Sequence, residues 1–150
     1  MKQLKFAGQI NLAAGRAVKQ PIDVAPFIEH TNLKPEATQQ DIARLCEEAQ
    51  RFHFYGVCVN PCFVELATRK LKNTEVAVVS VVGFPLGANL SATKAEEAKR
   101  ISQLGATEID MVLPIGAIRS GGHQYVYEDI RSVTEVSNKD PVKVIIETCL

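Results

Sequence analysis

Short apolar runs rich in β-branched residues recur along the chain, each followed by a polar loop and a segment with helical spacing. The runs predict strands at Val57–Val59, Val76–Val82, Ile109–Leu113 and Val142–Ile146, with a weaker one at Phe27–Ile28. Strand and helix alternate about every thirty residues, and the strands are almost continuously apolar, which is typical of a parallel sheet covered by helices. The predicted fold class is therefore α/β.

Four segments carry apolar residues at the spacing of an amphipathic helix. The predicted helices are Thr38–Phe52, Pro61–Leu71, Ser91–Leu104 and Tyr125–Val136. Thr38 and Ser91 are the expected N-cap residues, and Gly105 is the expected stop signal after the third helix. Residues 1–25 have mixed polarity and predict a leading helix or arm, and residues 26–150 predict one domain without an internal linker.

Charge and hydropathy restrict the possible partners. The 17 Lys and Arg residues balance 17 Asp and Glu residues, so net charge does not favour binding to nucleic acid or to an anionic membrane surface. The longest apolar run, Val76–Phe84, is interrupted by Ser80 and is much shorter than the roughly 20 residues that span a bilayer. Polar residues interrupt the N-terminal segment where a signal peptide would be apolar, so we expect a cytoplasmic protein.

The four cysteines are too few for a scaffold built on disulfides, and we expect them to be reduced. Cys58 and Cys62 lie four residues apart, but no second pair of Cys or His residues has the spacing of metal ligands. The sequence therefore predicts no metal site.

Two charged residues lie inside apolar strands. Asp110 interrupts the run that ends at Leu113, where a buried carboxylate is costly unless it is paired or used in catalysis. A general acid or base and a structural ion-paired aspartate are both compatible with this position.

Lys143 lies between Val142 and Val144, and strand alternation places it on one face with Ile145 and Glu147. Burial would lower the pKa of its amine and make it a nucleophile, whereas a neighbouring carboxylate would keep it charged. A lysine that extends from the strand end into solvent is the third interpretation.

Five segments in register resemble the deoxyribose-phosphate aldolase family of class I aldolases. The matching segments are Ile28–Pro35 (IEHTNLKP), Gly56–Pro61 (GVCVNP), Val81–Ala88 (VVGFPLGA), Glu108–Val112 (EIDMV) and Val142–Thr148 (VKVIIET). Their order and spacing agree across nearly all of residues 25–150, which makes the resemblance specific.

The resemblance implies a (β/α)8 TIM barrel that reversibly cleaves 2-deoxyribose 5-phosphate to glyceraldehyde 3-phosphate and acetaldehyde. This reaction, a step of deoxyribonucleotide catabolism, proceeds through a lysine Schiff base and needs no metal or other cofactor. It implies that Asp110 is the acidic partner in proton transfer and that Lys143 lines the barrel interior near the reacting centre. The residues implied to bind substrate are Glu29, Thr31, Cys58 and Asn60. The family usually has Asp at the position of Glu29.

The family's Schiff-base lysine lies in a Lys-Thr-Ser-Thr-Gly-like motif, which these 150 residues do not contain, nor do they contain its glycine-rich phosphate loops. A barrel of this kind typically needs about 250 residues, so the chain corresponds to about five of the eight β/α units, a partial barrel. We therefore expect little or no activity from the isolated chain, with Lys143 as a fallback amine that would not support efficient catalysis.

Two other interpretations follow from the element count. Five parallel strands leave sheet edges and an apolar interior open, which favours a self-associating module that completes the barrel as a homodimer or a higher oligomer. An open, flavodoxin-like sheet that binds a small phosphate ligand fits the number of elements but not the motifs.

Overall fold

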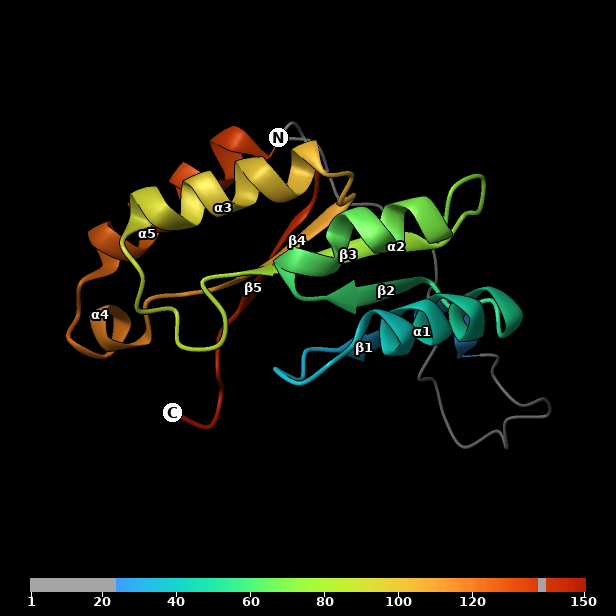
Figure 1. Cartoon of the computed structure of the whole chain (residues 1–150). Coiled ribbons are helices and arrows are strands. Elements are labelled where there is room, and N and C mark those ends of the chain that lie inside the picture. Colours follow the sequence, from blue (N-terminus) through green and yellow to red (C-terminus); the bar gives the residue numbers. More distant parts are fainter. Residues whose placement is uncertain (1–23, 138–139) are drawn as a thin grey trace, which may run out of the picture.

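The computed structural model describes residues 24–137 and 140–150. Five strands form one parallel sheet in chain order, β1-β2-β3-β4-β5 (Figure 1). The strands are β1 (Glu29–Asn32), β2 (Gly56–Val59), β3 (Ala77–Val82), β4 (Glu108–Val112) and β5 (Val142–Ile145). The predicted α/β class and parallel sheet are confirmed.

Helices connect consecutive strands and cover one face of the sheet. The α-helices are α1 (Gln39–Arg51), α2 (Val64–Lys70), α3 (Ser91–Gln103), α4 (Ile115–Arg119) and α5 (His123–Val136). Two 3-10 helices, η1 (Ala25–Phe27) and η2 (Pro61–Phe63), precede β1 and α2. Figure 1 shows α3 alongside α5 over the β4–β5 half, with α1 and α2 over the other half. The four predicted helices are present, and α4 is an additional short one.

Strand alternation separates two faces. Side chains such as Val57, Ile109 and Val144 belong to the main apolar core against the helices. The opposite face carries a smaller apolar cluster of Cys58, Val79 and Val81. This second face is the inner, concave face of the sheet, and it also carries the charged residues of the strands.

The sheet is strongly curved. Lys143 on β5 donates a hydrogen bond to Glu29 on β1, although three strands lie between them. In a flat sheet, four strand spacings would separate these strands by about 19 Å. The contact therefore requires a partial barrel. The strand order 1-2-3-4-5 also differs from the 2-1-3-4-5 order of a flavodoxin-like sheet, so that alternative is wrong.

One predicted helix cap is present and the other is not. Thr38 and Asp41 form a reciprocal capping box at the start of α1, with the Asp41 amide 3.2 Å from the Thr38 hydroxyl. The N-cap of α3 is Leu90, whose carbonyl accepts from the Lys94 amide. Ser91 is already inside the helix, and its hydroxyl lies 3.4 Å from that of Tyr125, so its predicted cap role is wrong.

The weak strand predicted at Phe27–Ile28 is also misplaced. Pro26 lies in the first turn of η1, where its fixed φ and missing N–H are tolerated, and the Phe27 amide donates to the Val24 carbonyl. The strand begins at Glu29 instead. Of the predicted leading arm, residues 1–23 lie outside the described residues, and Ala25 belongs to η1.

Candidate active site

Four charged side chains from three strands meet on the concave face. The ammonium group of Lys143 on β5 lies 3.0 Å from Glu108 Oε1 and 3.1 Å from Asp110 Oδ1, both on β4. It also donates a hydrogen bond to Glu29 on β1. One cation therefore contacts three carboxylates, in a cluster that spans both edges of the sheet.

Local sequence explains most of this arrangement. Glu108 and Asp110 are two residues apart on β4, so their side chains lie on the same face. Asp110 pairs in register with Lys143 on the neighbouring strand, which places carboxylate and amine side by side. Glu29 joins the cluster only because the sheet curves.

Burial and the ion pairs act in opposite directions on the protonation of Asp110. Burial raises the pKa of the Asp110 carboxyl, and the Lys143 ammonium compensates only in part, so the pKa stays above its ordinary value. The buried Oδ1 of Asp110 has the Lys143 ammonium as its ion-pair partner, at 3.1 Å. Asp110 is thus a carboxyl whose protonated form is favoured more than that of an ordinary aspartate.

The balance for Lys143 is reversed. Burial lowers the pKa of its amine, but Glu29, Glu108 and Asp110 together outweigh burial and raise the pKa above its ordinary value. Lys143 is therefore an ammonium ion at neutral pH. Of the interpretations left open by the sequence, a neighbouring carboxylate that keeps the lysine charged describes this structure.

The implied substrate-binding residues occupy different levels of the same face. Thr31 and Cys58 are register partners on β1 and β2, and the Thr31 hydroxyl donates to the Glu29 carbonyl at 2.9 Å. Cys58 is buried, and burial raises the pKa of its thiol to about 12, with the negative charge of Asp110 adding to the effect. Asn60 follows β2 and is half-buried at the start of η2. The structure thus clusters Glu29 with Asp110 and Lys143, whereas Asn60 lies beyond the carboxyl end of its strand.

The amino-acid pattern alone assigned no role to Glu108 or Tyr55. The Tyr55 hydroxyl donates to Glu108 Oε2 at 2.8 Å, while the other oxygen of Glu108 faces Lys143. The position of Glu108, two residues before Asp110, is a signal that strand alternation could have used. Tyr55 precedes β2, and nothing in its sequence context indicates this contact.

A second ion pair was also missed, and it lies outside the cluster. Lys94 on α3 contacts Asp129 on α5 at 2.7 Å, and both side chains are completely buried. Lys94 also donates to the Val112 carbonyl at the end of β4, at 2.9 Å. This pair joins two helices and the end of the strand that carries Asp110.

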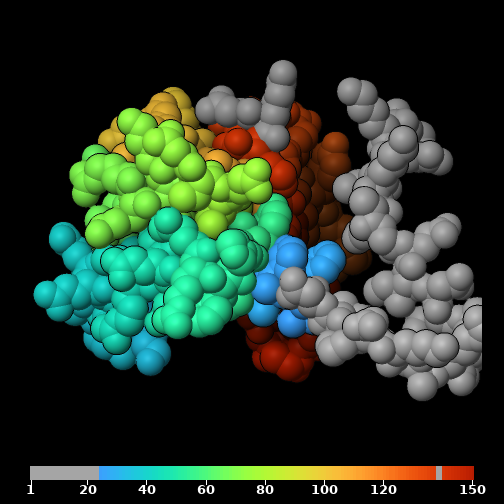
Figure 2. Space-filling model, turned by 90° about the vertical axis from the view of Figure 1, so that its right-hand side faces the viewer, coloured from blue at the N-terminus to red at the C-terminus, as the bar shows by residue number. Residues whose placement is uncertain are grey.

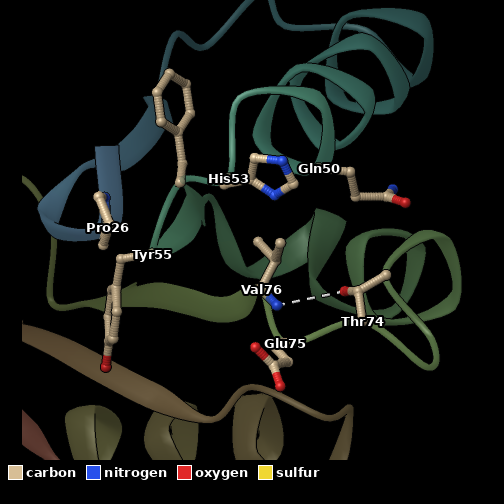
Figure 3. A pocket seen from close by; sticks show the side chains of 8 residues that line it. Pro26, Gln50, His53, Tyr55, Thr74, Glu75 and Val76 are labelled. Atoms are coloured by element: carbon tan, nitrogen blue, oxygen red, sulfur yellow. Dashed lines mark hydrogen bonds between the residues drawn. The ribbon is translucent and has the colours of Figure 1, made fainter. Parts of the chain in front are cut away.

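A pocket lies at the other end of the strands, where they begin. It has a volume of about 600 Å³ and is lined by Pro26, Gln50, His53, Phe54, Tyr55, Thr74, Glu75 and Val76. Figure 2 views this end of the molecule, where the blue segment that contains η1 lies beside the end of α1. In Figure 3 the Tyr55 ring extends from the pocket towards β4, so its hydroxyl leaves the pocket and reaches Glu108.

Within residues 24–137 and 140–150, no group of three or more His, Cys, Asp or Glu side chains is placed to hold a metal ion. None of the helices in those ranges combines the length and apolar character needed to cross a bilayer.

Comparison with known proteins connects this geometry to aldolases. A family model described as DeoC/LacD family aldolase matches residues 22–150. A deoxyribose-phosphate aldolase of Thermotoga petrophila is 59% identical over 127 residues, which cover 85% of this chain and 51% of that protein.

Solved structures of similar proteins have the same arrangement of strands and helices. A protein of Coccidioides immitis, described as a proposed deoxyribose-phosphate aldolase, has a TM-score of 0.81 at 40% identity, covering 84% of this chain and 50% of its own. A deoxyribose phosphate aldolase of Aeropyrum pernix, described as tetrameric, has a TM-score of 0.77 at 30% identity, covering 84% and 53%. The chain thus spans about half the length of the relatives that it matches.

Proposed function

Since the chain belongs to the DeoC/LacD family of aldolases, we propose that it supplies the β1–β5 part of a deoxyribose-phosphate aldolase. The reaction is reversible cleavage of 2-deoxyribose 5-phosphate to glyceraldehyde 3-phosphate and acetaldehyde through a lysine Schiff base. The observation that carries the proposal is the pairing of Asp110 with Lys143 on the concave face of a partial barrel. The ligand is a small phosphorylated sugar, and no cofactor is required.

Asp110 is the proposed proton-transfer group. Cleavage of the carbon–carbon bond requires a hydroxyl proton to leave as the bond breaks, and the reverse condensation returns it. A carboxyl with a raised pKa holds a proton closer to neutral pH than an ordinary aspartate does, which suits it to this exchange. Lys143 keeps its own proton and supplies positive charge beside the carboxylate.

The Schiff-base amine must come from elsewhere. Lys143 is an ammonium ion in contact with three carboxylates and has no free electron pair for attack on a carbonyl. The 150 residues contain no Lys-Thr-Ser-Thr-Gly segment. We therefore propose that these residues alone have little or no aldolase turnover, and that borohydride traps no adduct on Lys143.

A chimaera tests the proposed function. Residues 22–150 would replace the matching half of the Thermotoga petrophila aldolase, which is 59% identical over the aligned region. We expect cleavage of deoxyribose 5-phosphate by the chimaera, and a loss of about 100-fold or more in kcat on Asp110→Asn, as for removal of a general acid or base. A folded chimaera without activity, or one that Asp110→Asn leaves unaffected, would contradict the proposal.

A second candidate is self-association of the 150-residue chain. Among the described residues, β1 pairs only with β2 and β5 only with β4, so both outer strands present unpaired backbone groups. Such edges favour pairing with another copy. We propose a homodimer or a higher closed oligomer, which light scattering would detect; a monomer at micromolar concentration would exclude it.

The proposed location is the cytoplasm. All four cysteines are free, which suits a reducing compartment. The proposal includes no nucleic-acid or membrane partner, since positive and negative side chains balance.

A further inference from the structure

We propose that Glu108 is a positioning residue: its carboxylate, fixed by Tyr55, holds the ammonium group of Lys143 in place against Asp110. The inference deepens the proposed function and rests on it for the role of Asp110. It assigns a task to two residues that do not need to touch the substrate.

Glu108 is the best-fixed of the three carboxylates around Lys143. Its side chain is 8% exposed, compared with 15% for Asp110 and 25% for Glu29. Each of its oxygens has a different partner: Oε2 accepts from the Tyr55 hydroxyl at 2.8 Å, and Oε1 faces Lys143 at 3.0 Å. A carboxylate held at both oxygens cannot rotate without losing one contact.

Lys143 needs such an anchor because its own strand does not fix it. It extends from the outer strand β5, and its side chain is 42% exposed, so the four-carbon stem has room for several rotamers. Glu108 approaches it from the start of the neighbouring strand β4, and Glu29 approaches it from β1. Together they define one position for the ammonium group, 3.1 Å from Asp110 Oδ1.

The surroundings of Asp110 contain few other charges. Lys143 faces it from β5, Glu29 from β1, Glu108 from its own strand, and the Cys58 thiol from β2. Strand β3 contributes the apolar side chains Val79 and Val81 to this face. Because Lys143 is the one cation among these groups, its placement controls how readily Asp110 loses its proton.

Tyr55 links this cluster to the opposite end of the strands. It lines the pocket there, and the bond to Glu108 raises the pKa of its own hydroxyl, as expected for a donor to a carboxylate. Tyr55 is 45% exposed and lies outside the buried core, so replacement by Phe removes one hydroxyl without opening the core. Tyr55→Phe therefore tests the anchor while every charge in the cluster remains.

The test uses the 150-residue chain and nuclear magnetic resonance, without substrate. Two quantities are measured: the exchange rate of the Lys143 ammonium protons with water, and the titration midpoint of the Asp110 carboxyl carbon. We expect Tyr55→Phe and Glu108→Gln each to speed up ammonium exchange several-fold. Tyr55→Phe should also raise the Asp110 midpoint, since every charge in the cluster remains but the Lys143 ammonium is no longer held against Asp110.

Matched controls separate positioning from general effects. Tyr127→Phe removes a tyrosine hydroxyl from an exposed position on α5, and Glu135→Gln removes one carboxylate that pairs with Arg131 on the same helix. Neither control should change either quantity. Ammonium exchange in Tyr55→Phe and Glu108→Gln that matches the controls would overturn the proposal, and so would an unchanged Asp110 midpoint in Tyr55→Phe. Failure of the aldolase chimaera would leave both readouts intact, so the two proposals fail separately.

Discussion

Lys143 and Glu29 join the last and the first strand of the sheet through a hydrogen bond across its concave face. The two residues are 114 positions apart in the chain. Their contact ties the curvature of the sheet to the charge balance of the candidate site, so substitutions here should affect both stability and chemistry.

Replacement of Lys143 by Met should destabilise the chain at neutral pH. The variant leaves three carboxylates close together without their cation, and Glu108 and Asp110 are mostly buried. Because Lys143 is itself partly exposed, we expect a loss of about 1–3 kcal/mol in the free energy of unfolding, less than for a fully buried pair. Urea denaturation at pH 7 measures it.

Acid should reduce this loss. Without Lys143, the pKa of Asp110 in the folded chain rises further above its unfolded value. The folded variant therefore takes up protons as the pH falls, and the difference in the free energy of unfolding between variant and wild type becomes smaller. Urea denaturation of both proteins at pH 7 and pH 5 checks the sign. Arg69→Met, at an exposed pair with Glu65, should show almost no loss at either pH. Equal losses for Lys143→Met at both pH values would contradict the interpretation.

Asp110→Asn should separate stability from activity. Since the pKa of Asp110 is raised in the folded chain, its ionised form opposes folding, and stability falls as the pH rises from the unfolded pKa through the folded one. The amide removes this dependence. We expect the variant to be at least as stable as wild type at pH 7, while the chimaera that carries it loses activity. Thermal unfolding as a function of pH measures the first effect, and a marked destabilisation at pH 7 would count against it.

The buried pair of Lys94 and Asp129 should matter for folding. Lys94→Met leaves the Asp129 carboxylate completely buried without its cation and removes the donor to the Val112 carbonyl. Loss of one partner of a buried pair typically costs about 3–5 kcal/mol. The double variant Lys94→Met/Asp129→Leu should regain part of this loss, because it removes the unpaired charge as well. If the double variant is no more stable than Lys94→Met alone in urea, the pair does not act in this way.

The thiols should differ in reactivity. Cys46 and Cys58 are buried, and burial raises their pKa values to about 11 and about 12, whereas Cys62 and Cys149 are exposed. Because the thiolate is the reactive form, an alkylating reagent at pH 8 should modify the exposed pair first. Mass spectrometry of the native chain measures the order, and denatured chain should label at all four sites. Early labelling of Cys58 in the native chain would contradict its burial.

Sequence reasoning succeeded where one strand carries the information by itself. Alternation is a local property, so the β-branched runs gave four strands, and Asp110 and Lys143 could be selected as charges in apolar strands. It failed where tertiary structure decides: Glu29 reaches Lys143 only through curvature, and Tyr55 reaches Glu108 from a loop 53 positions away. Strand β1 was misplaced because all four of its residues, Glu29–Asn32, are polar, so no apolar run marks it in the sequence.

The loop between β3 and α3 should be sensitive to a single methyl group. Gly87 has a φ of 65°, and a Cβ there would lie 2.0 Å from the Leu113 carbonyl oxygen, a backbone atom that cannot move aside. Gly87→Ala combines this clash with a left-handed backbone conformation. We expect it to lower the free energy of unfolding by more than about 3 kcal/mol. Gly121→Ala is the matched control, because Gly121 has a φ of 76° but no atom within 4 Å of the added group. We expect Gly121→Ala to lower the free energy of unfolding by only about 1 kcal/mol, because only the left-handed backbone conformation is unfavourable there. Chemical denaturation of both variants measures the difference, and similar losses would show that the loop does not rest on the end of β4 as the structure has it.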